Sequence, residues 1–170
     1  MPPITKLWLS TLKAKDCIES SEFTSLLSQI LTHCSSYTNS QSKPEQPPMH
    51  AFLHSVENPD QLLMITGCPS QEINNAADGT WLKLLDLDVC SLPLADDDLV
   101  LQFRDAPANL GADQVVGGWD VWPETEQGIN MTKAGKLGDV PKTWVGIGKE
   151  VKTGLTPARE TFHFRKVKAA

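Results

Sequence analysis

The stretch MHAFLHSVENPDQLLMITG, residues 49–67, constrains the fold more than any other part of the chain. Two apolar runs flank VENPD, in which Asn58, Pro59 and Asp60 are residues that favour a tight turn. Because a short connection of this kind joins antiparallel neighbours, we expect strands at 49–56 and 61–67 that pair with each other. The chain should therefore contain an antiparallel sheet.

A single long helix is predicted over about residues 20–38. Its apolar residues recur at helical spacing and form one stripe, made of Phe23, Leu26, Leu27, Ile30, Leu31 and Cys34. Ser20 or Ser21 can cap its start. Further strands are expected at 5–13, 99–104, 115–124 and 160–167, and 142–151 suits either a strand or a short helix. A short helix is expected at 71–78, followed by helical turns within 80–87.

Composition and charge exclude several functional classes. The 170 residues are 40% hydrophobic and suit one domain spanning 1–170, while the net charge of −6 argues against nucleic acid as a partner. No apolar window approaches the ~18 residues that a membrane span needs, and the first 15 residues do not resemble a secretory signal. Four widely spaced cysteines indicate reduced thiols in a cytoplasmic protein.

Three motifs and the order of the expected elements together point to a known fold. The expected order is strand, helix, loop, strand, turn, strand, helix. VENPD, then QLLMITG, then PSQE opening a helix, resembles the antibiotic-biosynthesis-monooxygenase-like (ABM-like) branch of the dimeric α+β barrel superfamily. The resemblance covers residues 5–90 and the last strand near 160. It implies an α+β fold, with a ferredoxin-like antiparallel sheet, helices on one face, and a second subunit on the other face that closes the barrel. Residues 91–170 would then be an extended, loop-rich segment forming a lid or side wall, with its final strand at 160–167.

The resemblance also carries expectations about function. Members of the family include cofactor-independent monooxygenases, polyketide cyclases, isomerases and haem-degrading enzymes, with ligand pockets between the sheet and its helices. The present chain departs from the family at Cys68, where an aromatic residue is common, and at Asn74 and Ala77, where histidines are common. Haem is therefore not expected, and we predict no cofactor.

His50 and His54 are the first candidate catalytic residues. Four positions apart on a strand, they share one face with Phe52, and a phenylalanine on that face indicates that the face is covered. Two such imidazoles can act as acid and base near neutral pH. The alternative is a pair of surface or interface histidines. No third ligand is recognisable nearby, so no metal is predicted.

The remaining candidates follow from the region that the family places over the pocket. Asp78 could act as a base and Asn74 could hold an oxyanion, with Trp81 beside them; the alternative for all three is capping and turn chemistry around Gly79. Further along the chain, the candidate pocket walls are Trp119, Trp122 and His163. The three adjacent carboxylates Asp96, Asp97 and Asp98 are interpreted as a solvated loop rather than a cation site.

These observations lead to one principal hypothesis and two alternatives. The chain is predicted to be a homodimeric, cofactor-independent enzyme of secondary metabolism, which isomerises or cyclises a hydrophobic polyketide- or terpenoid-type molecule by proton transfer. One alternative is a cofactor-free monooxygenase of the ABM type. The other is a non-catalytic dimeric ligand-binding or accessory protein that kept the barrel and lost the chemistry.

Overall fold

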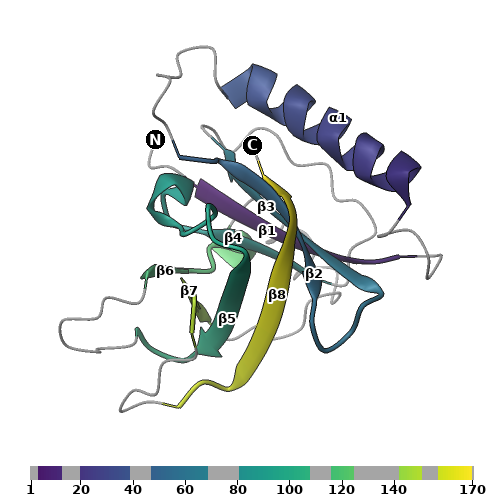
Figure 1. Ribbon diagram of the computed structural model, residues 1–170. Helices are drawn as coiled ribbons and strands as arrows, with labels where there is room; N and C mark the ends of the chain where they lie inside the picture. Colours follow the sequence, from purple (N-terminus) through teal and green to yellow (C-terminus); the bar gives the residue numbers. More distant parts are fainter. Residues whose placement is uncertain are drawn as a thin grey trace, which may run out of the picture.

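A computed structural model of the chain describes residues 4–12, 20–38, 47–68, 81–107, 116–124, 142–150 and 157–169. Eight strands form a single antiparallel sheet that curves round into a nearly closed barrel (Figure 1). The strands are β1 (Ile4–Thr11), β2 (His50–Ser55), β3 (Gln61–Cys68), β4 (Trp81–Leu85), β5 (Asp98–Arg104), β6 (Val116–Trp119), β7 (Trp144–Gly148) and β8 (Glu160–Ala169). The helical elements are α1 (Ser21–Thr38) and two short 3-10 turns, η1 (Val89–Ser91) and η2 (Trp122–Glu124).

The strand order is β4-β1-β3-β2-β8-β5-β7-β6, and it contains a repeat. The first four strands of the chain are arranged fourth, first, third, second, and the last four are arranged in the same way. The two halves are joined by pairing of β2 with β8, from Ala51 opposite Ala169 to Ser55 opposite Phe164. The outer edges, β4 and β6, meet at a bridge between Leu85 and Asp120, so one chain supplies the whole circumference of the barrel.

Leucine, isoleucine, valine and phenylalanine side chains fill the interior of the barrel. Successive side chains on a strand point to opposite faces, so every second residue of each strand contributes to this core. Its strand residues include Leu7, Leu9, Ala51, Leu53, Leu63, Ile65, Leu85, Leu99, Leu101, Phe103, Val145, Ile147 and Phe164. Val89, Leu92 and Leu94, from η1 and the loop after it, belong to the same cluster. The core is therefore one contiguous unit shared by both halves of the chain.

Helix α1 lies against the outer face of the sheet, over β2 and β8 (Figure 1). Its start is capped as predicted, because the Phe23 N–H donates to the Ser20 hydroxyl (3.3 Å). Leu27 and Leu31 from the predicted apolar stripe are buried against Phe52 and Leu62. The predicted helix at 20–38 is thus confirmed, and it covers the face of β2 that carries Phe52.

The predicted fold class is wrong. The expectation was a ferredoxin-like α+β sheet with helices on one face and a second subunit on the other. The structure is mostly antiparallel sheet, with eight strands in a nearly closed barrel and α1 as the one α-helix among the described residues. The face predicted to meet another subunit instead meets β5 to β8 of the same chain. The described parts of residues 91–170 consequently supply β5 to β8, which make up half of the barrel.

Most of the local predictions are confirmed. The 49–67 hairpin is present, and its turn is held by the Asn58 side chain, which accepts from the Asp60 N–H (3.3 Å). The strands predicted at 5–13, 99–104 and 160–167 correspond to β1, β5 and β8, and 142–151 contains β7. The stretch predicted as a strand at 115–124 contains β6, but its last three residues form η2. The helical turns predicted within 80–87 are wrong, because Trp81–Leu85 is strand β4, paired with β1. The predicted helix at 71–78 lies outside the described residues.

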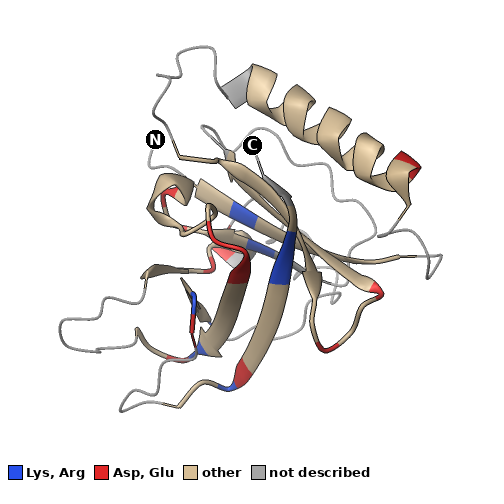
Figure 2. Cartoon of the chain, in the orientation of Figure 1, with Lys and Arg blue, Asp and Glu red and all other residues tan. Residues whose placement is uncertain are grey.

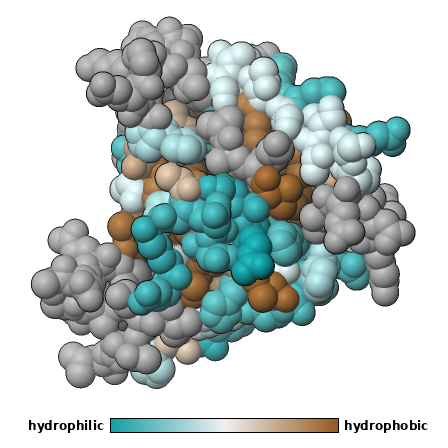
Figure 3. All heavy atoms as spheres, viewed as in Figure 1, coloured by the Kyte–Doolittle hydropathy of each residue, from teal (hydrophilic) through white to brown (hydrophobic). Residues whose placement is uncertain are grey.

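The acidic run at the start of β5 is paired with basic side chains. Asp96 contacts Lys149 (2.9 Å), Asp97 contacts Lys166 (3.3 Å) and Asp98 contacts Arg165 (2.9 Å). Figure 2 shows the acidic start of β5 beside the basic stretch of β8, and Figure 3 shows a hydrophilic patch across the middle of this face. No helix in the described parts of the chain is long and apolar enough to cross a membrane.

Candidate functional site

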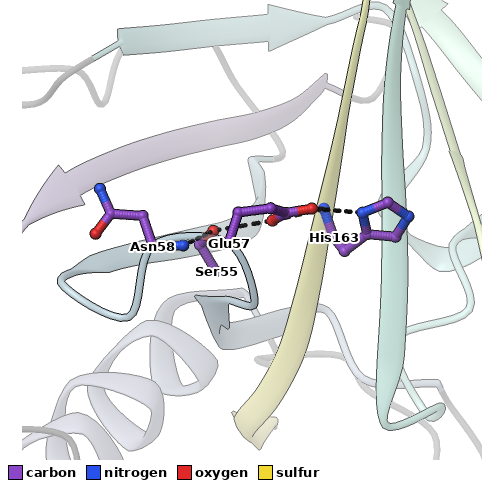
Figure 4. A network of polar contacts seen from close by, with 4 residues as sticks. All are labelled: Ser55, Glu57, Asn58 and His163. Atoms are coloured by element: carbon purple, nitrogen blue, oxygen red, sulfur yellow. Dashed lines mark hydrogen bonds and ion pairs between the residues drawn. The ribbon is translucent and has the colours of Figure 1, made fainter.

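The clearest arrangement of reactive side chains lies where the β2–β3 turn meets β8. Glu57, two residues beyond the end of β2, extends across to His163 on β8 (Figure 4). A Glu57 carboxylate oxygen lies 2.5 Å from His163 Nδ1. The His163 backbone N–H also donates to the carboxylate, at 3.1 Å from Oε1. Side chain and backbone of one histidine are thus held by the same carboxylate.

The position of Glu57 is itself fixed by the turn. The Ser55 hydroxyl donates to Glu57 Oε2 (3.2 Å) and accepts from the Asn58 N–H (3.1 Å). Ser55 is 2% exposed, because it is the last inward-facing residue of β2. These contacts, drawn in Figure 4, form a chain from the buried end of β2 through the carboxylate to the imidazole ring. The ring is therefore oriented by groups that are anchored in the barrel.

Hydrogen bonding sets the charge of Glu57. Burial would raise the pKa of its carboxyl, but hydrogen bonds from the His163 ring, from backbone N–H groups and from Ser55 outweigh that effect and lower the pKa. The carboxylate is then ionised at neutral pH and can only accept hydrogen bonds. His163 Nδ1 must carry the proton between them, which leaves Nε2 of a neutral ring as an acceptor.

His54 lies close to this pair on the same face. Phe164 and Ser55 point inward and are buried, so His163 and His54 point outward. His54 is opposite Arg165 in the β2–β8 ladder, which makes His163 its diagonal neighbour, with Cα atoms about 7–8 Å apart. The sequence predicted both histidines as site residues, and the structure brings them together from different halves of the chain.

Valine side chains border His163 on both sides. Val56 donates its N–H to the His163 carbonyl (2.9 Å), and Val100 is the partner of His163 on β5. Val56 is 52% exposed, whereas Val100 is buried. The His163 side chain is 45% exposed, so an external molecule can reach its ring. Val100 gives this strand face an apolar residue directly opposite His163, whereas Arg165, two residues along β8 on the same face, is paired with Asp98 (2.9 Å).

His50 is separated from this site. It is 1% exposed, its Nδ1 lies 2.5 Å from Thr66 Oγ1, and its burial lowers its pKa below the ordinary 6.5. Four residues of strand place it about 13 Å from His54. Phe52, packed on Leu27 and Leu31 of α1, fills the face between them. The two histidines that the sequence pairs therefore do not meet at one reacting atom.

The other predicted residues are dispersed. Trp122 packs with Ile4 and Leu84 outside the barrel, and Trp119 ends β6 with Lys142 Nζ 5.5 Å from its ring centroid. Asn74 and Asp78 lie outside the described residues, as does the side chain of Trp81, whose backbone begins β4. Among the described residues, no group of three or more His, Cys, Asp or Glu side chains could hold a metal ion.

Glu57 is the site residue that the sequence did not indicate. It lies within the predicted turn, where an acidic residue is ordinary, and its partner is 106 positions away along the chain. No local pattern links the two residues.

Comparisons with protein-family models, curated proteins and solved structures find no match to this chain. The resemblance of residues 49–72 to the ABM-like branch therefore stays a prediction.

Proposed function

We propose that the chain is a cofactor-independent enzyme that transfers a proton on a hydrophobic small molecule, by isomerisation or cyclisation. The observation that carries the proposal is the oriented Glu57–His163 pair, with His54 beside it. A carboxylate that holds Nδ1–H of an imidazole fixes the tautomer, directs Nε2 outward and stabilises the imidazolium once a proton is taken up. His163 is the base, Glu57 positions it, and His54 is the acid.

Three further features favour a small apolar substrate. Val56 and Val100 lie on the two chain segments that flank His163, the ring is accessible, and the charged Arg165 on the same outer face is already paired with Asp98. A proton removed by His163 and a proton returned by His54 would act on atoms a few ångströms apart. That separation suits migration of a double bond or closure of a ring.

A homodimer of this protein would not form by two subunits closing one barrel, as the family resemblance implies. Because one chain nearly closes the barrel, a second copy is not needed for closure, and a dimer would form through outer surfaces. Size-exclusion chromatography with light scattering at micromolar concentration tests it. Cytoplasmic location is part of the same proposal, and subcellular fractionation tests it.

Metabolite profiling tests the proposal. The gene is deleted in the source cells, and each strain then receives a copy of the gene that encodes one variant. His163→Gln and His54→Gln should cause accumulation of a precursor with the same mass as the lost product. General acid–base groups typically contribute about 10²–10⁴-fold in rate, so the product should nearly vanish. His33→Gln, on the exposed side of α1, is the matched control and should restore the wild-type profile.

The outcomes separate the three functional classes. A lost product one oxygen atom heavier than the accumulated compound would replace proton transfer with oxygenation. Full complementation by His163→Gln would refute the proposal and favour a non-catalytic binding protein, in which the Glu57–His163 contact only fastens the turn to β8. Thermal unfolding of each purified variant shows whether a lost product reflects lost chemistry or lost folding.

A further inference from the structure

The repeated strand order makes two seams of the barrel equivalent in topology. At each seam the second strand of one half meets the fourth strand of the other, which gives β2 against β8 and β6 against β4. The β2–β8 seam is a ladder with five residue pairs, with one register shift between Phe52 and Leu53. The β4–β6 seam, in the described residues, has the single bridge between Leu85 and Asp120. The two topologically equivalent seams thus differ greatly in how many residue pairs join their strands.

Side chains replace the missing ladder at the β4–β6 seam. Backbone bonds there run from Asp86 N to Trp119 O (3.1 Å) and from Val121 N to Leu84 O (2.7 Å). In addition, a carboxylate oxygen of Asp86 accepts from Trp119 N, and a carboxylate oxygen of Asp120 accepts from Leu84 N (3.2 Å). Each strand edge therefore receives a carboxylate from the other, in a reciprocal arrangement.

A buried ion pair reinforces one of these carboxylates. Lys83 faces the barrel interior opposite Leu7, and its Nζ lies 2.8 Å from Asp120 Oδ2 and 6.0 Å from the centroid of the Phe103 ring. The Asp120 side chain is 2% exposed and that of Lys83 is 16% exposed. Lys83 thus bridges from β4 to the residue that follows β6, at the end of the apolar core.

We propose that the β4–β6 seam is a gate at which the barrel opens and recloses while the rest of the fold stays intact, and that Lys83, Asp86 and Asp120 latch it. A ladder of several residue pairs, such as β2–β8, can separate only if many backbone bonds break together. The β4–β6 seam is closed by few backbone bonds and by side chains that can rotate away. Its opening gives access to the apolar interior beside Phe103, independently of the Glu57–His163 site.

Hydrogen exchange followed by mass spectrometry or NMR tests the gate directly. In low denaturant, the amides of Asp86 and Val121 should exchange at least tenfold faster than the amide of Val56, which donates to His163 across the β2–β8 seam. Asp86→Ala removes an exposed acceptor and should raise exchange at the Val121 amide severalfold. Lys83→Met should raise exchange at both seam amides by tenfold or more.

Two variants serve as matched controls. Lys166 is a comparably shielded lysine, 19% exposed and paired with Asp97, and it lies on β8 at the other seam, so Lys166→Met should leave exchange at the β4–β6 seam unchanged. Asp98→Ala removes an exposed carboxylate from the β5–β8 region and should do the same. If wild-type seam amides exchange only with global unfolding, at the same rate as Val56, the gate does not exist. If Asp86→Ala and Asp98→Ala accelerate exchange equally, the latch assignment is wrong.

Discussion

Gly67 is the position where one added methyl group should most clearly perturb the barrel. It lies on β3 with its missing side chain directed at η1, and a Cβ atom there would lie 2.3 Å from Val89 Cγ1 and 3.2 Å from Met49 Cε. Carbon atoms in favourable contact are about 3.5–4.0 Å apart. The Met49 methyl can move aside, but Val89 is 2% exposed and would have to retreat by more than about 1 Å. Gly67→Ala therefore forces η1 away from the sheet.

Two opposing effects set the size of the change. Overpacking of a well-packed core costs about 1–3 kcal/mol in the free energy of unfolding. Replacing glycine by alanine reduces the freedom of the unfolded chain and returns about 0.4–1 kcal/mol. The overpacking term is larger, so we expect a net loss of about 1–2 kcal/mol. For a chain of this length, that corresponds to a fall in Tm of about 2–8 °C.

Urea unfolding can distinguish a specific clash between residues 67 and 89 from a general loss of stability. The variants to compare are Gly67→Ala, Val89→Ala and the double variant. Val89→Ala alone should cost about 2 kcal/mol through lost burial. In the double variant the clash with Val89 Cγ1 is removed and only a close approach to the Cβ of residue 89 (3.2 Å) remains, so its loss should be smaller than the sum of the single losses by about 1 kcal/mol. Gly148→Ala is the control, since its nearest neighbour would be Glu150 O at 3.9 Å, and it should show only the unfolded-state gain of about 0.4–1 kcal/mol. Unchanged stability of Gly67→Ala, or strict additivity in the double variant, would refute the reasoning.

Three further predictions concern charge and burial. Burial lowers the pKa of His50 below 6.5 in the folded state, so the contribution of His50 to stability is complete above about pH 6.5 and is lost as pH falls below it. The free energy of unfolding should fall by at most about 1.4 kcal/mol per pH unit in that range. His50→Gln should flatten this dependence in urea titrations. Asp120→Ala should cost about 3–5 kcal/mol because it strands Lys83 and two backbone N–H groups, whereas Asp120→Asn, whose amide oxygen can still accept, should cost clearly less; equal losses would contradict the hydrogen-bonding role. Glu57→Gln should cost less than about 1 kcal/mol at pH 7, since both partners are about half exposed, and a larger loss in thermal unfolding would mean that the pair is mainly structural.

Local sequence patterns predicted most helices and strands of the fold correctly. Beyond the 49–67 hairpin, they did not predict which strands pack or pair with one another. The VENPD turn and the Phe23-to-Cys34 stripe identified a hairpin and a helix because each signal is local along the chain. Apolar residues on both faces of a strand show that both faces are covered, but they do not show by what. Packing against a second subunit and packing against the second half of the same chain would produce the same sequence pattern. In this protein the strands that complete the barrel and cover that face are β5 to β8.

Strand β4 shows how tertiary pairing overrides local preference. TWLKLLDL is rich in residues that favour helices, yet Trp81–Leu85 pairs with β1, with Lys83 opposite Leu7. The site was recoverable only in part for a similar reason. His54 and His163 stood out as histidines on patterned strands, whereas Glu57 acquires its role from a strand that is 106 residues distant.

The position of β8 has a consequence for biosynthesis of the protein. The last strand along the chain lies between β2 and β5, with ladders on both sides. Until residues 160–169 have left the ribosome, the β2 and β5 edges of the nascent chain lack these partners, and such edges can pair with other chains. Long-range pairing of this kind also slows folding. Chaperone demand during synthesis should therefore peak before residues 160–169 emerge, and a chain cut within β8 should aggregate rather than form a smaller folded barrel.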